Sequence, residues 1–508
     1  MDICPYFREY HIIMKKPLKI LLYIISLIII VLALSKSFKQ YYGCRLDGDI
    51  AESVLPYPDI QKTFDDPTGI KTIINNDSHL GPNRFFSHYF LHKTFREIPF
   101  LLQNFYDPIE SVYYTSAISK LLMQILILFL LTTIILGSFN IFSLKFIVTF
   151  LILIPFIPTN GTHLSHEIGL IDRSVTYSFF YAIPLIFLLL YYLPLFFEFL
   201  HNKKIKMNWI LIILWAIFAI IACFSGPIIP PTILIANFIL LFYLFIKNWK
   251  ENTNRPFFEK VVKALKLITV RNYLFLLPIS LLALYSTFLG TYNMAYSGVQ
   301  LPLKDLYLIL PRGVLNSLAT ISYLMILLLL ISHYLIVFYK YRNDLQAKKI
   351  FDLYRFLIIF SIIYILILPF GGYRPYRPLI LRYDTIIPIT VLSIITIYYT
   401  FLFIVKQFKT ETWKYWLKTT YFVMFFAILV IFAAKNKTKT YNSCEKLSLY
   451  TIANSKEEIV ILDNECAVVG WEPIYSPEES KPYAELLYFW NITDEVKLYY
   501  NLPKSNEK

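Results

Sequence analysis

The stretch ILLYIISLIIIVLALS, residues 20–35, decides the class of fold, because it is apolar throughout and carries no charged side chain. A segment of this kind is stable as a helix inside a bilayer. Eleven such runs are expected to cross the membrane, at about 20–35, 118–136, 143–158, 176–197, 208–224, 228–246, 272–290, 313–338, 356–370, 379–405 and 417–434. The two runs that flank Ser225-Gly226-Pro227 leave a single kinked helix open as an alternative. The sequence predicts an all-α polytopic membrane protein of about eleven transmembrane helices.

Composition and charge agree with a membrane protein and indicate its orientation. The chain is 57% hydrophobic and 16% charged, whereas a soluble domain is roughly 25% charged. The formal net charge of +14 comes from basic residues concentrated in alternate connections, at 203–206, 247–271, 340–355 and 406–418. Because cytoplasmic loops carry the excess of Lys and Arg, we expect a cytoplasmic N-terminus and an extracytoplasmic C-terminus. The charge then reports orientation and contact with anionic membrane lipids, not nucleic acid.

Four regions follow from this count. They are a cytoplasmic head with the first helix (1–35), a first outer loop (36–117), a transmembrane body (118–434) and an extracytoplasmic C-terminal domain (435–508). The pieces 84–96 and 98–106 of the first outer loop mix aromatic and basic residues, which is typical of amphipathic helices lying in the headgroup layer. A cytoplasmic helix is expected near 256–268. The C-terminal domain is expected to be small and mixed α/β, with a disulfide between Cys444 and Cys466 permitted there. The Ile-, Lys- and Asn-rich composition favours a bacterial inner membrane.

Polar residues outside the spans gather in three places, all predicted on the outer side. The first is Asp47-Gly48-Asp49 with Glu52, directly after the first helix. The second loop holds His163, His166, Glu167 and Asp172, and the loop after the ninth span holds Arg374, Arg377 and Arg382.

Each cluster has a functional and an ordinary interpretation. The carboxylates after the first helix are either a catalytic group or a solvated surface. His163-x-x-His166-Glu167 differs in order from both common zinc-hydrolase motifs, so a zinc hydrolase is disfavoured. A Mg²⁺ or Mn²⁺ ion shared by Asp49, His163, His166, Glu167 and Asp172 suits the oxygen ligands better.

The three arginines of the late loop are either headgroup anchors or a phosphate site. They fall within nine residues and alternate with prolines and tyrosines, in the sequence RPYRPLILR at 374–382. Guanidinium groups bind phosphate bidentately. We therefore predict that this loop binds a phosphate.

The layout resembles the GT-C superfamily, the polytopic glycosyltransferases that use polyprenyl-phosphate-linked sugars. Members have a cytoplasmic N-terminus, an acidic motif in the first outer loop, juxtamembrane helices, further acidic residues in the second outer loop and, often, a soluble outer domain. The layout matches over the whole chain, and the residues that match are Asp47-Gly48-Asp49 with Glu52, and Glu167 with Asp172. The chain departs from the Asp-Glu pair of many members and from the second-loop D-x-D of oligosaccharyltransferases.

This resemblance implies sugar transfer at the outer face, from a polyprenyl-phosphate donor to a glycan, lipid or protein acceptor. Asp49 or Asp47, near Glu52, would act as general base, and Arg374, Arg377 and Arg382 would stabilise the leaving phosphate. Two other classes stay open. A lipid-linked oligosaccharide polymerase or ligase would carry its long outer loop late in the chain, and a transporter or flippase would carry charges inside its spans. Here the long outer loop comes first and the spans hold almost no charge.

Overall fold

Long apolar helices make up the body of the protein. The computed structural model describes residues 16–157, 168–206, 208–251, 256–296, 301–373, 378–408, 415–434 and 441–503. Within these ranges nine helices are long and apolar enough to cross a membrane. They are α1 (Lys16–Tyr42), α6 (Pro108–Leu136), α9 (Val175–His201), α11 (Ile229–Glu251), α13 (Val270–Leu289), α15 (Ile321–Tyr341), α16 (Leu345–Ile367), α17 (Ile387–Gln407) and α18 (Tyr415–Ala434). The predicted class, an all-α polytopic membrane protein, is thereby confirmed.

Two of the expected spans are shorter helices. The run at 143–158 forms α7 (Leu144–Leu153) and the 3-10 turn η1 (Ile154–Phe156), and the run at 208–224 forms α10 (Trp209–Cys223). The segment around Gly226 separates α10 from α11, so these two runs are distinct helices and not one kinked helix. The count of eleven spans stays a prediction.

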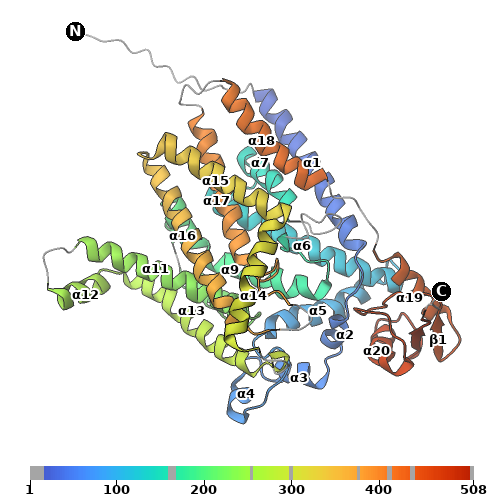
Figure 1. Cartoon of the computed structure of the whole chain (residues 1–508). Coiled ribbons are helices and arrows are strands. Elements are labelled where there is room, and N and C mark those ends of the chain that lie inside the picture. Colours follow the sequence, from blue (N-terminus) through green and yellow to red (C-terminus); the bar gives the residue numbers. More distant parts are fainter. Residues whose placement is uncertain are drawn as a thin grey trace, which may run out of the picture.

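The helix ends sort to two ends of the bundle (Figure 1). Toward one end, Lys120 in the first half of α6 donates a hydrogen bond to the carbonyl of Arg173, just before the start of α9, at 2.5 Å. At the other end, a ring nitrogen of His201 in α9 lies 2.8 Å from the Ile134 carbonyl of α6. Helices α6 and α9 therefore run in the same direction, and the chain returns between them through α7 and η1.

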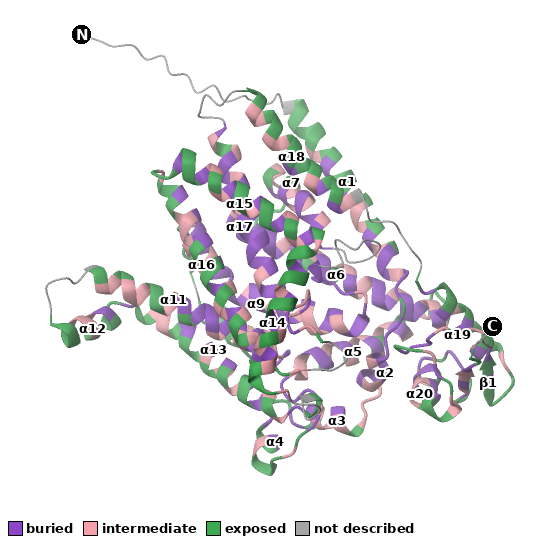
Figure 2. Cartoon of the chain, in the orientation of Figure 1, coloured by how far each residue is buried: buried purple, intermediate pink, exposed green. Residues whose placement is uncertain are grey.

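The centre of the bundle is formed by α6, α9 and α17. The most apolar window of α17 is 83% buried, whereas that of α1 is 11% buried. Figure 2 shows the same contrast, with buried residues along the central helices and exposed residues along α1 and α18. Exposed apolar side chains on a helix this long are those that contact lipid in a membrane.

The segment predicted as the first outer loop folds into four helices beside one end of the bundle, which is called the outer end below because the sequence predicts that side. They are α2 (Asp49–Val54), α3 (Pro58–Asp65), α4 (Ile70–Asn75) and α5 (Phe85–Leu102). The two amphipathic pieces expected at 84–96 and 98–106 are in fact one helix, α5, which continues through Pro99. Proline lacks an N–H, so the Phe95 carbonyl loses its helical donor; the indole N–H of Trp490 donates to it instead, at 2.9 Å.

Two further boundaries differ from expectation. The span expected at 313–338 is divided at Thr320 into α14 (Leu303–Ala319) and α15, and the span expected at 379–405 begins only at Ile387. The reason is packing: a Cβ on Gly313 would lie 2.9 Å from the Leu381 carbonyl oxygen, so α14 lies closely against the 378–386 segment. The expected cytoplasmic helix near 256–268 is present as α12 (Phe257–Lys266). Three 3-10 turns, η2 (Gly290–Tyr292), η3 (Met294–Tyr296) and η4 (Leu368–Gly371), complete the body.

Residues 441–503 form a small unit at the outer end, which is called the C-terminal unit below. It contains α19 (Ser443–Asn454), β1 (Ile459–Leu462), η5 (Pro477–Ser480), α20 (Lys481–Phe489) and β2 (Leu498–Asn501). The two strands pair in parallel, with Ile459 opposite Leu498. Cys444 and Cys466 are joined by a disulfide. Figure 1 shows this unit beside α2 and α5.

Candidate functional site

Asp47 lies between α1 and α2 in the chain, but its side chain is buried against the N-terminus of α9. Its Oδ2 accepts hydrogen bonds from the Ser174 hydroxyl at 2.9 Å and the Thr176 N–H at 3.0 Å. Its Oδ1 accepts one from the Thr176 hydroxyl at 2.6 Å. The first N–H groups of a helix have no partner within the helix and favour a negative charge. Asp47 therefore serves as a helix cap that ties the first outer loop to the second.

Asp49 begins α2 and faces the C-terminal unit. The indole N–H of Trp471 donates a hydrogen bond to Asp49 Oδ1 at 2.8 Å. The Trp471 ring also stacks on Tyr177 of α9, with ring centres 5.5 Å apart and planes inclined by 27°. A Cβ on Gly48 would lie 2.6 Å from Trp471 Cδ1, so the backbone can approach the indole only because residue 48 is glycine. The Asp47-Gly48-Asp49 motif thus joins the bundle to the C-terminal unit.

Glu52 lies one helical turn after Asp49, on the same face of α2. It is half-buried, and this burial, together with the charges of Asp49 and Asp59, raises the pKa of its carboxyl group. Tyr483 of α20 is near enough for the charges of Glu52 and Asp49 to act on it, and burial is the main cause of its raised pKa. A carboxyl group whose pKa is raised in a polar site is suited to proton transfer.

Asp172 connects the second outer loop to the late loop. Its Oδ1 accepts a hydrogen bond from the Ser174 N–H at 2.8 Å, and its Oδ2 accepts one from the Tyr383 hydroxyl at 3.3 Å. Burial raises the pKa of the Asp172 carboxyl group. Gly169 has a φ of +68°, and a Cβ there would lie 2.5 Å from the Tyr383 ring. Close packing of the ring on Gly169 therefore holds the two loops together.

Arg382 is held inside its own loop. Its Nε lies 2.7 Å from Asp384 Oδ1, and its Nη1 donates to the Leu379 carbonyl at 3.0 Å. Tyr181 of α9 donates to the other oxygen of Asp384 at 3.2 Å. Arg382 therefore contacts groups of its own loop, and one of these, Asp384, is bonded to α9. Arg374 and Arg377 lie outside the described residues.

The first, second and late outer loops accordingly meet at the N-terminus of α9. Asp47 and Asp172 are both bonded there, and Tyr177 and Tyr181 on α9 lead from Asp49 to Asp384, with their ring centres 5.9 Å apart. These contacts bring the three loops together, whereas a common cavity lined by Asp49 and Arg382 stays a prediction.

Lys120 was passed over in the sequence, although it lies inside an apolar run. Its side chain is fully buried on α6, and its Nζ donates to the Arg173 carbonyl at 2.5 Å. A charged residue inside a span is a signal that could have identified it. Because its partner is the backbone of the second outer loop, Lys120 belongs to the outer end of the bundle and not to its centre.

Glu445 is the second group that the sequence did not indicate. It is fully buried in α19 and accepts hydrogen bonds from the Leu46 N–H (3.0 Å), the Tyr113 hydroxyl (2.7 Å) and the Val469 N–H (2.9 Å). Burial raises the pKa of its carboxyl group to about 7. No local pattern marks it, because its partners come from three separate segments. It attaches the C-terminal unit to the residue before Asp47.

The expected metal site is only partly within the described residues, since His163, His166 and Glu167 lie outside them. Among the residues that the structure describes, no three His, Cys, Asp or Glu side chains gather closely enough to hold a metal ion. Asp49 and Asp172, the two candidate ligands that are described, each accept hydrogen bonds from other side chains. The metal site therefore stays a prediction, and no metal ion is used in the chemistry below.

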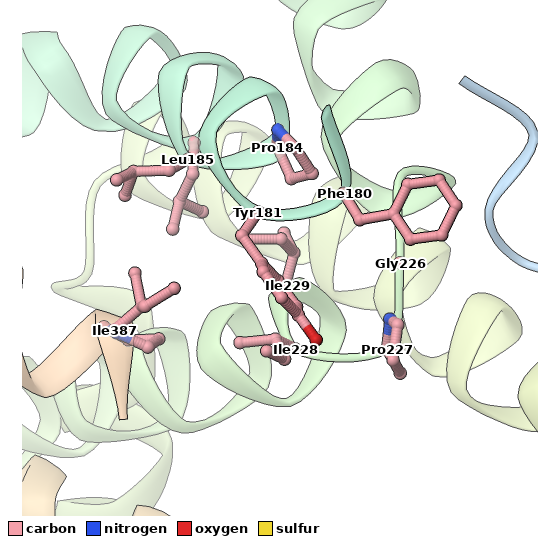
Figure 3. A pocket seen from close by; sticks show the side chains of 11 residues that line it. Phe180, Tyr181, Pro184, Leu185, Gly226, Pro227, Ile228, Ile229 and Ile387 are labelled. Carbon is pink, nitrogen blue, oxygen red and sulfur yellow. The ribbon is translucent and has the colours of Figure 1, made fainter. Parts of the chain in front are cut away.

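Figure 3 shows a small cavity beside Tyr181, between α9, the start of α11 and the start of α17. Its volume is about 20 Å³, which is room for about one water molecule. Apart from the Tyr181 side chain, its walls are apolar, with Phe180 and Ile387 on opposite sides. It is too small and too apolar to hold a sugar.

Comparison of the chain with protein-family models, with curated proteins and with solved structures gave no match. The fold therefore defines the class, an integral membrane protein of the all-α polytopic kind with a small unit packed on one end of its bundle.

Proposed function

We propose that this protein is a membrane glycosyltransferase, which moves a sugar from a polyprenyl-phosphate donor to an acceptor at the outer face of the membrane. The observation that carries the proposal is the meeting of three outer loops at the N-terminus of α9, through Asp47 to Ser174 and Asp172 to Tyr383. A transferase for a lipid-linked donor needs a base and phosphate-binding groups close to the membrane surface. The GT-C-like order of acidic motif, juxtamembrane helix and outer unit supports the same assignment.

In this proposal Asp49 is the general base and Asp47 is a positioning residue. Asp47 is buried with three hydrogen bonds, so its oxygens are engaged in holding α9. Asp49 is only half-buried, and Glu52 with its raised pKa lies one turn away. Asp49 takes the proton of the acceptor hydroxyl as that oxygen bonds to the anomeric carbon. The bond from the anomeric carbon to the phosphate oxygen breaks, and the electron pair leaves with the lipid phosphate.

The leaving phosphate needs positive charge placed in advance. Arg382 is the described candidate, and Arg374 and Arg377 in the same loop are the others. Arg382 uses Nε and Nη1 on Asp384 and Leu379, and its other terminal nitrogen extends the fork toward a phosphate. Direct attack with one base predicts inversion at the anomeric carbon.

The outer location is supported by the disulfide between Cys444 and Cys466. Disulfides persist in oxidising compartments outside the cytoplasm. Because Glu445 joins this unit to the Leu46 N–H, the acidic motif lies on the same side of the membrane.

The test compares two amide replacements in the first outer loop. Asp49→Asn should abolish transfer of radiolabelled sugar from a panel of polyprenyl-phosphate sugars to endogenous acceptor, in purified protein in detergent. Asp65→Asn is the matched control, because Asp65 is exposed in the same loop and bonded only locally, to Gln61. Full activity of Asp49→Asn would refute its role as base, and activity that EDTA abolishes would show that a metal takes part after all.

Reconstituted vesicles separate the proposal from the two other classes. Label that crosses the membrane without covalent transfer would make the protein a transporter or flippase. Transfer of preformed oligosaccharide, with no use of single-sugar donors, would make it a polymerase or ligase.

A further inference from the structure

A flat aromatic surface lies beside the acidic motif, and the proposed chemistry does not use it. Trp471 is 47% exposed although one face of its ring is stacked on Tyr177 and its edge lies against Gly48. About half of the Trp471 side chain is therefore open to a ligand, although Tyr177 covers one face of the indole. Large exposed aromatic rings held in a fixed orientation are typical of binding sites.

Carboxylates lie at the edge of this ring and not above it. The Trp471 N–H points in the plane of the indole, so its hydrogen bond of 2.8 Å places Asp49 Oδ1 beside the ring. Glu52 follows one turn away on α2. The outcome is an open aromatic face bordered on one side by hydrogen-bond acceptors.

We propose that Trp471, stacked on Tyr177 and bordered by Asp49 and Glu52, is a subsite that binds a pyranose ring of a glycan acceptor. The C–H groups on one face of a sugar ring would lie on the exposed indole face, and equatorial hydroxyls at the ring edge would donate to the carboxylates. That the bound glycan is an acceptor rests on the proposed transferase function, whereas the binding of a glycan to this subsite does not.

The arrangement of the carboxylate favours a sugar over a cation. An organic cation bound by aromatic rings lies over the ring face, usually enclosed by several rings. Here Tyr177 covers one face of the Trp471 ring, no cage of rings is formed by this pair, and the Asp49 carboxylate lies beside the indole. This geometry presents a plane with acceptors at its border, which matches a flat ring with hydroxyl donors at its rim.

The position of Trp471 relative to Asp49 is fixed by contacts outside the subsite. The Trp490 indole N–H donates to the Phe95 carbonyl at 2.9 Å, and the Gln103 amide donates to the Trp490 carbonyl at 2.7 Å. On the other side of the unit, Lys446 Nζ lies 2.7 Å from the Glu110 carboxylate of α6. These contacts hold the unit against α5 and α6, so the aromatic face is in place before the ligand arrives.

Two variants separate the ring face from the hydrogen bond. Trp471→Phe keeps an aromatic face but removes the N–H donor to Asp49, and Trp471→Leu removes both. Tyr488→Ala is the matched control, because Tyr488 is half-exposed on α20 of the same unit. The probes are maltotetraose, mannotetraose and tetra-N-acetylchitotetraose at millimolar concentration, with full-length protein in detergent, read by saturation-transfer difference NMR.

We expect at least one tetrasaccharide to bind the unaltered protein and Tyr488→Ala. Binding should weaken about tenfold in Trp471→Leu, which is about 1.4 kcal/mol, and much less in Trp471→Phe. Equal binding by Trp471→Leu and the unaltered protein, or no binding of any tetrasaccharide, would overturn the proposal. Choline that binds at Trp471 while the glycans do not would overturn it in favour of a cation site.

Kinetics separate this subsite from the proposed chemistry. Trp471→Phe and Trp471→Leu both lose the hydrogen bond to Asp49 and should lower kcat alike, but only Trp471→Leu should also raise the KM for acceptor clearly. Asp49→Asn should lower kcat without raising this KM. Glycan binding without any transfer would leave the subsite standing and refute the transferase. Transfer in which both Trp471 variants lose kcat at unchanged KM would show that Trp471 only orients Asp49, and the subsite would be refuted.

Discussion

Replacement of Asp47 tests whether this carboxylate is a helix cap or the catalytic base. In Asp47→Ala the Thr176 N–H and the hydroxyls of Ser174 and Thr176 lose their buried acceptor. In Asp47→Asn one amide oxygen remains to accept, but the charge at the helix N-terminus is lost. Asp47→Ala, which keeps no acceptor, should therefore be less stable than Asp47→Asn, which keeps one.

The magnitude follows from the contacts. Loss of an N-cap costs about 1 kcal/mol, and a buried group left without a charged partner costs about 1.5–3 kcal/mol. These terms overlap, since one carboxylate makes all three bonds, so we expect Asp47→Ala to cost about 2–3 kcal/mol. Asp47→Asn keeps an acceptor and loses mainly the interaction of its charge with the α9 dipole and the hydroxyls, about 1–2 kcal/mol.

The assay is amide hydrogen exchange of the peptide that covers residues 174–181, together with the apparent Tm in detergent. Exchange of this first turn of α9 should be fastest in Asp47→Ala, intermediate in Asp47→Asn and unchanged in Asp49→Asn. Asp49→Asn is the control, because it removes a carboxylate two residues away whose bonded partner is the Trp471 indole N–H. Exchange at the unaltered rate in Asp47→Ala would show that the three hydrogen bonds contribute no stability, and the assignment of Asp47 as a cap would have to be abandoned.

Three further predictions concern the C-terminal unit. The pKa of Glu445 is raised to about 7 from 4.5, so its contribution to stability is full below about pH 4.5 and is lost as pH rises through about 7. The apparent Tm of the unaltered protein should therefore fall over this pH window, and that of Glu445→Gln should fall less. Equal falls in Tm for the two proteins would contradict this prediction. The disulfide closes a loop with a sequence separation of 22 residues, so Cys444→Ala with Cys466→Ala should cost the unit about 3 kcal/mol, seen as faster proteolysis within 441–503; unchanged proteolysis would count against it. Alkaline phosphatase fused after residue 440 should be active, and a reporter that works only in the cytoplasm should be silent there. The opposite result would show that the predicted orientation in the membrane is wrong.

The sequence predicted the helical body because the signal for a long buried helix is local. The apolar runs lie within α1, α6 and α9, although α1 continues to Tyr42 and α6 begins at Pro108 and not near 118. The helix α17 begins at Ile387 and not near 379. That error has a tertiary cause. The segment 379–386 combines apolar residues with Arg382 and Asp384. Asp384 contacts Tyr181 and Arg382, and these contacts hold the segment outside the helix.

The single helix α5 shows a second limit of local patterns. Pro99 predicts a break, because it leaves the Phe95 carbonyl without a donor. The donor comes from Trp490, which is 395 residues away in the sequence. No pattern within the first outer loop could reveal that partner, so the continuous helix could be known only from the fold.

The candidate site was predictable in its acidic part and not in its aromatic part. Asp47, Asp49 and Glu52 stood out because carboxylates closely followed a span. Their separate roles did not, because a cap and a base differ only in their partners: Asp47 is bonded to α9 and Asp49 to Trp471. Trp471 itself carried no signal, since an isolated tryptophan in a polar tail is as often part of a core.

The position of Gly48 joins these observations into one constraint on the motif. A side chain at residue 48 would strike the Trp471 ring, and the ring could move away only by giving up the stack on Tyr177 and the bond to Asp49. Gly48 therefore links the position of Asp47, which caps α9, to the position of Asp49, the proposed base. A motif read as two carboxylates with a spacer is better understood as a contact point, at which the C-terminal unit sets the orientation of the carboxylate assigned to the chemistry.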